Sequence, residues 1–209
     1  MKVVAVVAQK GGVGKTTIAT CLAVEGERRG FSVSILDLDP QATASFWHDT
    51  RRCETPAVVS LQASRIRPVL KSAEEAGCDL AILDAAAIAR DVIYAASASA
   101  DYVLIPTKTS VFDVTSLLET VEIVRQTGNP LSVVLNFVPP RGIETKDAFE
   151  LLDHQGIRVS PAKIGNRKAI FRAQGFGKTV QETDHQSKAA SEFRDLFDDV
   201  IGEMERRTP

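Results

Sequence analysis

The sequence lacks the features that would place it among membrane, metal-cluster or disulfide-rich proteins. Its longest early apolar run, residues 3–8, is too short to span a bilayer, and no signal-peptide cleavage region follows it. Its three cysteines, Cys21, Cys53 and Cys78, form no CxxC pair, so neither a zinc site nor a disulfide framework is indicated. We therefore expect a reduced, soluble, cytoplasmic protein.

Charge of neither sign is in large excess. The 25 basic and 27 acidic residues give a formal net charge of −2, so any binding to nucleic acid needs a local basic patch. The 209 residues are 44% hydrophobic and 25% charged, which excludes disorder, collagen-like repeats and coiled-coil arrays. No repeat or linker interrupts the chain, and we expect residues 1–209 to form a single domain.

Short apolar runs alternate with longer amphipathic stretches along the chain. The predicted strands are residues 3–8, 33–38, 58–61, 80–83, 102–105 and 131–135. The predicted helices are residues 16–29, 65–76, 114–127, 145–155 and 187–206. This alternation is typical of an α/β fold, a mostly parallel twisted sheet with helices on both faces. In such sheets the ligand site lies beyond the carboxyl ends of the strands.

A glycine-rich turn follows the first predicted strand and opens the first predicted helix. Residues 10–17 read KGGVGKTT, and their glycines let backbone N–H groups turn inward to bind an anion. Lys15 can reach the β- and γ-phosphates, and the Thr16 hydroxyl can bind Mg²⁺. A dinucleotide-binding fingerprint is excluded because Thr17 stands where its third glycine is needed. The predicted nucleotide-binding residues of this turn are Lys10, Gly11, Gly12, Val13, Gly14, Lys15, Thr16 and Thr17.

Carboxylates follow two of the predicted strands. Asp37 and Asp39 end the second strand, and alternate residues of a strand point the same way. Beside Mg²⁺ and phosphates they can bind metal-coordinated water or orient the attacking water, and the alternative is that they cap a helix. Asp84 ends the fourth strand in the position of a Walker B aspartate, which holds a Mg²⁺-bound water. The predicted metal site therefore comprises Thr16, Asp37 and Asp84.

The turn and the DLDPQ segment at residues 37–41 resemble the deviant Walker A box and switch I of the ParA/MinD family of ATPases. Within it, the chain is most similar to the small, ParF-like partition proteins. The resemblance implies a P-loop NTPase fold and a catalytic set of Lys10, Lys15 and Asp39. In the family the residue matching Lys10 crosses a dimer interface to the partner's nucleotide, and the residue matching Asp39 positions the nucleophilic water.

Three further positions extend or depart from this pattern. Relatives usually continue the Walker B strand with Asp-Thr-Pro-Pro, whereas here Asp84 precedes three alanines at residues 85–87. Asn136, at the end of the sixth predicted strand, is a candidate for reading the adenine edge, or else forms a turn. Asp113 is expected to be scaffold. The chain lacks an [NT]KxD element, which favours ATP over GTP.

A basic stretch lies late in the chain, at residues 156–178, and contains no acidic residue. In ParA relatives this region and the last helix bind nonspecific DNA once ATP has formed the dimer. The resemblance therefore implies a DNA-binding role for Lys163, Arg167, Lys168, Arg172 and Arg194. The alternative is a solvated charged face with no partner.

Taken together, the motifs favour a ParA-type partition ATPase that uses ATP and Mg²⁺. The resemblance implies an ATP-dependent homodimer that binds nonspecific DNA, is nucleoid-associated, and segregates or positions a plasmid or chromosome. A ParB-like adaptor would stimulate hydrolysis. We expect no helix-turn-helix extension before the first predicted strand, and therefore no operator-specific repression.

Other functions remain to be weighed against this one. The same ATPase could position a protein cluster or a microcompartment, and nothing in the sequence separates these cargoes. A MinD-like ATPase of the membrane surface needs a basic amphipathic tail, whereas residues 198–209 carry four acidic side chains, so we expect no membrane partner. Nitrogenase-like iron proteins need a paired-cysteine cluster site, which this chain lacks. A decayed, non-enzymatic scaffold is disfavoured because the site residues are all present.

Overall fold

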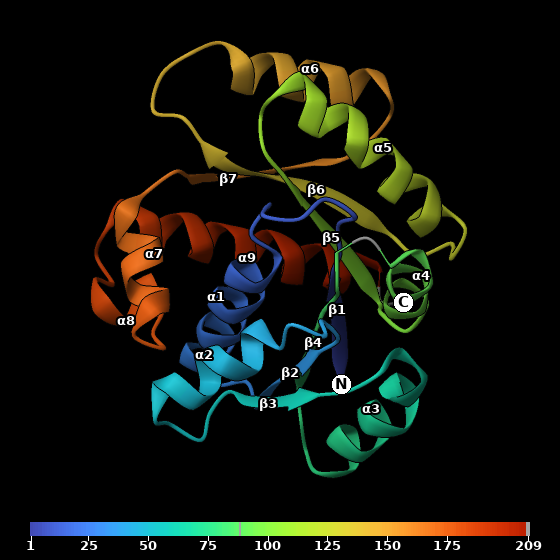
Figure 1. The fold of residues 1–209 in the computed structure, drawn as a ribbon, viewed down its shortest axis with the longest axis vertical. Helices are drawn as coiled ribbons and strands as arrows, with labels where there is room; N and C mark the ends of the chain where they lie inside the picture. The colour runs from blue at the N-terminus through green and yellow to red at the C-terminus, as the bar shows by residue number, and fades with distance from the viewer. Residues whose placement is uncertain (88, 208–209) are drawn as a thin grey trace.

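The computed structural model describes residues 1–87 and 89–207, which alternate between strands and helices (Figure 1). The strands are β1 (Lys2–Val6), β2 (Val33–Asp37), β3 (Ala57–Ser60), β4 (Leu80–Asp84), β5 (Tyr102–Thr107), β6 (Leu131–Val138) and β7 (Val159–Gly165). The helices are α1 (Lys15–Arg28), α2 (Thr43–Arg51), α3 (Ile66–Glu75), α4 (Arg90–Ala98), α5 (Val111–Arg125), α6 (Glu144–His154), α7 (Lys168–Gly175), α8 (Val180–Thr183) and α9 (Lys188–Arg207), with a short 3₁₀ helix η1 (Ala63–Arg65). The strands form one sheet in the order β3-β2-β4-β1-β5-β6-β7, and neighbouring strands all pair in parallel.

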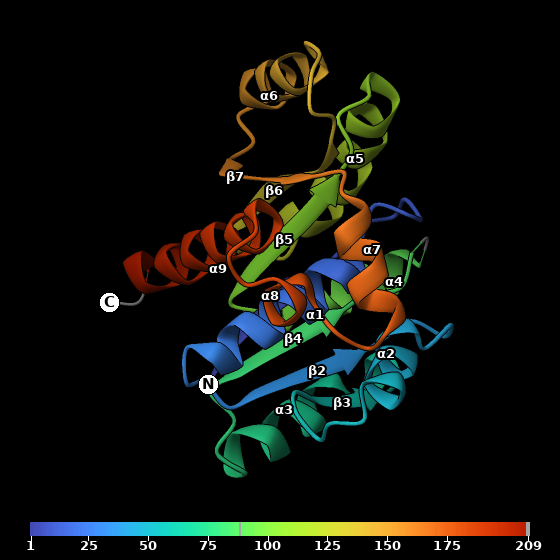
Figure 2. The same cartoon turned by 90° about the vertical axis from the view of Figure 1, so that its left-hand side faces the viewer.

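Both faces of the sheet are covered by helices, as the apolar strands predict. Val4 and Val6 of β1 belong to a core formed with α1 and α9, whereas Val3 and Ala5 belong to the opposite core, formed with α3 to α6. Figure 2 looks onto the face that carries α1, α8 and α9. Gly30, with a φ of +87°, follows the end of α1 and gives the left-handed turn that stops the helix. No helix of the described residues is long and apolar enough to cross a membrane.

The predicted α/β class is confirmed, but several elements were missed. The basic stretch at residues 156–178 contains the strand β7 and the helix α7. β7, an edge strand, alternates buried and exposed residues, because α9 packs against one of its faces and the other face is largely open. Pro161 and Lys163 are exposed on it and break the apolar run by which the other strands were found. Helices α2, α4 and α8 were missed as well, since each is short.

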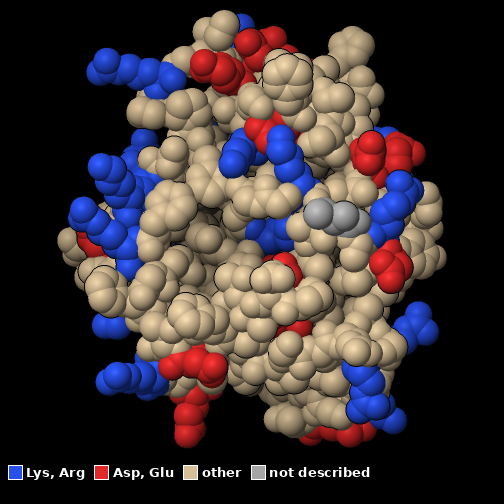
Figure 3. Space-filling model, viewed as in Figure 1, with Lys and Arg blue, Asp and Glu red and all other residues tan. Residues whose placement is uncertain are grey.

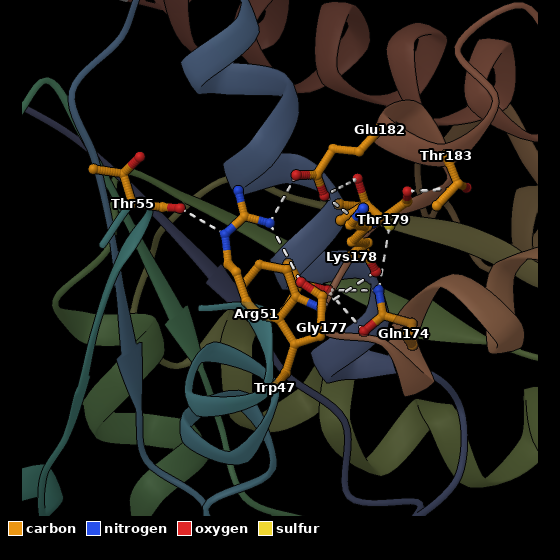
Figure 4. Close-up of polar contacts among 11 residues, drawn as sticks. Trp47, Arg51, Thr55, Gln174, Gly177, Lys178, Thr179, Glu182 and Thr183 are labelled. Carbon is orange, nitrogen blue, oxygen red and sulfur yellow. Dashed lines mark hydrogen bonds and ion pairs between the residues drawn. The ribbon is translucent and has the colours of Figure 1, made fainter. Parts of the chain in front are cut away.

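The helix that follows the second strand is fastened to the segment after α7 (Figure 4). The indole Nε1 of Trp47 donates to the carbonyl oxygen of Lys178 at 3.3 Å. The guanidinium of Arg51 donates to the Gly177 carbonyl at 3.4 Å and to a Glu182 carboxylate oxygen at 2.8 Å. It also lies over the indole ring, 5.0 Å from its centre. These contacts join α2, which comes directly after the switch I aspartates, to the basic α7–α8 region.

Gly177 allows this close approach, so Gly177→Ala should destabilise the protein. Its φ is +64°, and a Cβ there would lie 2.3 Å from the backbone nitrogen of Arg51 and 2.5 Å from its Cα. We expect a loss of about 2 kcal/mol or more, which lowers the melting temperature by roughly 4–8 °C. Differential scanning fluorimetry measures the shift.

Gly175→Ala, two residues earlier, is the matched control. It ends α7, and a Cβ there would have open space around it. Its melting temperature should stay at or slightly above that of the unchanged protein. Equal melting temperatures for the two variants would contradict the close contact at Gly177.

Candidate functional site

The register of the central strands brings the predicted site together. In the pairing of β1 with β4, Val6 lies opposite Asp84, and in the pairing of β2 with β4, Asp37 lies opposite the same residue. The carboxyl ends of these strands therefore meet at one edge of the sheet. The glycine-rich turn leaves β1 at this edge and leads into α1, so the turn and the predicted acidic residues share one site.

The turn has the conformation that its glycines predict. Gly12 and Gly14 adopt positive φ angles of +68° and +90°, which other residues rarely adopt. Gly14 is the N-cap of α1, and no side chain caps the helix there. The first N–H groups of α1 are therefore left for an anion, which the positive end of the helix dipole also favours.

Asn136 holds this turn from the end of β6. It is 4% exposed, and its Nδ2 donates to the Val13 carbonyl at 2.7 Å. Its Oδ1 accepts from the backbone N–H of Phe137 at 2.9 Å. The turn-forming alternative therefore describes its contacts in this structure. A Cβ at Gly14 would lie 2.3 Å from its Nδ2, so the turn and the amide fit closely. The contact of Asn136 with adenine stays a prediction, because both ends of its amide already bind the chain.

Lys15 lies buried beneath the turn, with 7% of its surface exposed. Its Nζ donates to the Lys10 carbonyl at 3.5 Å. Burial lowers the pKa of its ammonium group, while the negative charges of Asp84 and Asp39 oppose the shift. The buried cation and these carboxylates thus lie close enough to act on one another, as a phosphate and metal site requires.

Asp84 is a deeply buried acid of the site, and it fits the predicted metal role because its oxygens are left without a partner in the part of the chain that the structure describes. It is 1% exposed, and neither carboxylate oxygen has a hydrogen-bond partner among the described residues. Burial raises its pKa to about 7; the charges of Asp37 and Asp39 add to the rise, and Thr16 and Lys15 oppose it. A divalent cation would compensate the buried charge, so the free oxygens of Asp84 and the nearby Thr16 hydroxyl suit Mg²⁺.

The other two acidic residues of the site have different surroundings. Asp37 is fully buried, and it accepts from the backbone N–H of Asp39 at 3.1 Å and from the backbone N–H and hydroxyl of Ser45, each at 3.0 Å. Because Ser45 lies in the first turn of α2, Asp37 fixes the start of that helix, as the helix-capping alternative describes. Its metal role stays a prediction. Asp39 is partly exposed and accepts from the Gln41 N–H at 2.9 Å, which leaves it accessible from the site.

Asp113, which we expected to be scaffold, contacts a predicted catalytic residue. The Lys10 ammonium lies 2.5 Å from its carboxylate, and the side chains of Lys10 and Asp113 are 42% and 8% exposed. The Ser110 hydroxyl, at the N-cap of α5, also donates to this carboxylate at 2.5 Å. Burial raises the pKa of Asp113, but Lys10 and Ser110 outweigh burial and hold the pKa below its usual value. The sequence signal was the Ser-x-x-Asp capping pattern, but nothing local revealed Lys10 as the partner.

The residues predicted to bind DNA do not all carry a free charge. Arg167 donates to both carboxylate oxygens of Glu192, at 2.6 and 3.2 Å, so an acidic residue of α9 neutralises it. Arg194 donates to the His185 carbonyl at 2.7 Å. The remaining three are exposed and have no carboxylate within 4 Å among the described residues: Lys163, Lys168 and Arg172. Figure 3 shows basic side chains gathered along the edge of the molecule where α7 lies.

The geometry first defines a class: a P-loop nucleotide-binding protein with a lysine on each side of its glycine turn. The chain belongs to the family described as the CobQ/CobB/MinD/ParA nucleotide binding domain, whose profile matches residues 4–180. It is an ATPase that uses ATP with Mg²⁺, as the P-loop predicts.

Its relatives support this membership over most of the chain. "Maintenance of carboxysome distribution protein A" of Gloeobacter kilaueensis is 33% identical over 207 residues, covering 93% of this chain and 94% of that protein. "Chromosome-partitioning ATPase Soj" of Thermus thermophilus is 27% identical over 239 residues, covering 97% of this chain and 96% of that protein. Among solved structures, the septum site-determining protein MinD with Mg-ADP from Pyrococcus horikoshii has a TM-score of 0.80 at 18% identity and covers 99% of both chains. The structural likeness shows the same fold.

The buried charge of Asp84 predicts a pH-dependent stability when nucleotide and metal are absent. Its pKa is about 7 in the folded protein, whereas an aspartate in an unfolded chain titrates near 3.9. Between these values the folded state binds the extra proton, so stability should fall as the pH rises from about 4 to about 7. Asp84→Asn removes the charge and should stabilise the protein at pH 8 by roughly 2–4 kcal/mol.

Urea unfolding of the unchanged protein and of Asp84→Asn, at pH 4.5 and at pH 8, measures the difference in their stability. The stabilising effect of Asp84→Asn should be much smaller at pH 4.5, where the folded protein already carries the proton. Asp153→Asn is the matched control, because Asp153 is exposed. Asp101 would not serve, because its carboxylate accepts a hydrogen bond from the Val3 N–H. An equal gain at both pH values would show that the buried charge is not the cause.

Proposed function

We propose that this protein is a ParA-type partition ATPase, in which ATP joins two copies of the chain into a dimer that binds nonspecific DNA. The dimer segregates or positions a plasmid or chromosome, and a ParB-like adaptor stimulates hydrolysis and release. The observation that carries the proposal is the different placement of the two lysines of one turn. Lys15 is buried against the acids of its own site, whereas Lys10 stands at the rim, 42% exposed and held by an ion pair.

The roles of the site residues follow from this placement. The backbone N–H groups of residues 11–16 and the Lys15 ammonium bind and orient the phosphates, while Thr16 and Asp84 hold Mg²⁺. When bound, the cation neutralises charge that develops on the phosphate oxygens. Asp39 orients the attacking water, since it is the accessible acid of the site. Lys10 reaches the partner's nucleotide, so ATP favours the dimer by a contact that exists only across the interface.

The proposed DNA surface lies on the basic edge beside α7. Its free cations are Lys163, Lys168 and Arg172. We add Lys178 and Lys188, because both are exposed and have no carboxylate within 4 Å among the described residues. Such contacts neutralise phosphates without reading bases, so binding should be independent of sequence and sensitive to salt. Arg167 and Arg194 play a smaller part in this proposal, because their groups already bind the chain.

A second cargo is supported by one specific comparison. The relative from Gloeobacter kilaueensis is named for carboxysome distribution, and it matches this chain over nearly its whole length at 33% identity. The same ATP-dependent dimer on DNA would then position a protein-bounded compartment. Nothing in the described site separates the two cargoes, because the adaptor selects the cargo.

The proposed role of Asp39 predicts a separation of hydrolysis from nucleotide binding. Asp39→Ala should reduce the rate of phosphate release by about 100-fold or more, since the attacking water loses its orienting group. ATP affinity should change little, because the phosphates are held by the turn. Phosphate release and the fluorescence of a labelled ATP analogue measure the two quantities. Asp49→Ala on the exposed face of α2 is the control, and an effect of equal size there would contradict the assignment.

The proposed DNA surface predicts how binding responds to nucleotide, salt and charge removal. A duplex of arbitrary sequence should bind in the presence of ATP, not ADP, and Lys10→Ala should abolish binding. Lys168→Ala combined with Arg172→Ala should weaken binding by about 10-fold or more and lower the salt dependence by about one ion per lost phosphate contact. Fluorescence anisotropy across a salt series measures both.

Arg67→Ala combined with Lys71→Ala is the matched control, because both residues are exposed on α3. This pair should leave DNA affinity and its salt dependence unchanged. If the ATP-bound dimer forms but does not bind DNA, the basic edge is a solvated face, and the matrix has to be sought among lipid or protein surfaces.

A further inference from the structure

A second lysine lies beside the ion pair that holds Lys10. Lys108 directly follows β5, the strand that neighbours β1, and precedes the turn that leads to Asp113. Its ammonium lies 5.1 Å from the centre of the Phe137 ring, and that ring borders the glycine turn, 3.3 Å from where a Cβ of Gly14 would be. No carboxylate of the described residues lies within 4 Å of this ammonium. Lys108 is therefore a cation at the rim of the nucleotide site without an ion-pair partner of its own.

In this structure the charge of Asp113 depends on a neighbouring cation. Its side chain is 8% exposed, and in this structure its charge is balanced by Lys10 at 2.5 Å. The remaining contacts, with the Ser110 hydroxyl and the first turn of α5, are hydrogen bonds that carry no full positive charge. A buried carboxylate that loses its cation is strongly destabilised. Any movement of Lys10 away from Asp113 therefore has a large electrostatic cost unless another cation approaches.

The proposed function, on which this inference rests, requires such a movement. Lys10 cannot remain at 2.5 Å from Asp113 and also bind the phosphates of a nucleotide held by another copy of the chain. Without compensation, the energy lost at Asp113 would oppose the ATP-dependent dimer. An unpaired cation is available in Lys108, whose charge already acts on the Asp113 carboxylate.

We propose that Lys108 is a positioning residue that takes the place of Lys10 at the Asp113 carboxylate when Lys10 turns toward the partner's nucleotide. Three features support this. Lys108 is only partly buried and has a flexible four-carbon stem, so its ammonium can leave the Phe137 ring. The Ser110 cap fixes the Asp113 carboxylate within the same short turn. A lysine resting on an aromatic ring gives up a weak contact for a strong one.

The test is a double-mutant cycle on dimer formation, with a nonhydrolysable ATP analogue and sedimentation velocity. Lys108→Met keeps an unbranched side chain one atom shorter and removes its charge, and it should raise the dissociation constant of the dimer by about 10-fold or more. Lys108→Arg should restore dimer formation, because it keeps the charge. In an Asp113→Asn background, where no carboxylate needs a partner, Lys108→Met should have no effect on the dimer.

Two controls separate this effect from damage to the site. ADP, which should not form the dimer, must bind Lys108→Met and the unchanged protein with equal affinity, because the glycine turn is intact in both. Lys146→Met, on the exposed face of α6, should leave the dimer unaffected.

Each remaining outcome overturns the proposal at a different step. If Lys108→Met forms the dimer as well as the unchanged protein, or loses as much in the Asp113→Asn background, Lys108 only supports Phe137 and the exchange of cations is refuted. If the unchanged protein forms no dimer with the ATP analogue, the proposed function fails, and the role of Lys108 fails with it.

Discussion

The parallel direction of the strands is the constraint on which the rest of the site depends. Because β1, β2 and β4 are parallel neighbours in register, their carboxyl ends place Asp37, Asp84 and the glycine turn at one edge of the sheet. That edge gathers negative charge in a place with little access to water. Lys15 compensates part of this charge from beneath the turn, and a cation bound beside Asp84 would compensate the rest. The sheet that makes the core therefore also gathers the acidic residues beside the glycine turn.

The fold class and the conformation of the glycine-rich turn could be predicted because both depend on local pattern. Apolar runs mark the buried strands, and the spacing of glycine, lysine and threonine marks the turn between β1 and α1. The ion-pair partners of the charged residues could not be predicted, because they depend on which strands become neighbours in the sheet. Lys10 meets Asp113 only because β5 lies beside β1, and Arg167 meets Glu192 only because α9 lies against β7. The edge strand β7 escaped prediction because its exposed side has no apolar partner.

Charge composition alone gives an incomplete picture of this molecule. Arg158 lies between Asp199 and Glu203 of α9, and Arg167 is bound to Glu192 of the same helix. Much of the acidity of the last helix is therefore used to fasten that helix to β7. The side chains left unpaired at the surface near α7 are therefore more basic than the sequence average. Packing of α9 against β7 causes this separation of acidic from basic charge. A net charge close to zero is compatible with a strongly basic edge, because several acidic side chains are neutralised in ion pairs elsewhere in the fold.

The junction of α2 with the α7–α8 region has a consequence for how the protein can change over evolution. Trp47 and Arg51 donate hydrogen bonds to the backbone carbonyls of Lys178 and Gly177, so the two segments are joined through main-chain atoms as well as side chains. An insertion between Trp47 and Arg51, or between Gly177 and Lys178, would change the spacing that these two contacts need. The segment that carries Asp39 and α2 and the segment around α7 are therefore expected to change together in evolution. Grafting either segment from a relative would require transferring the other with it.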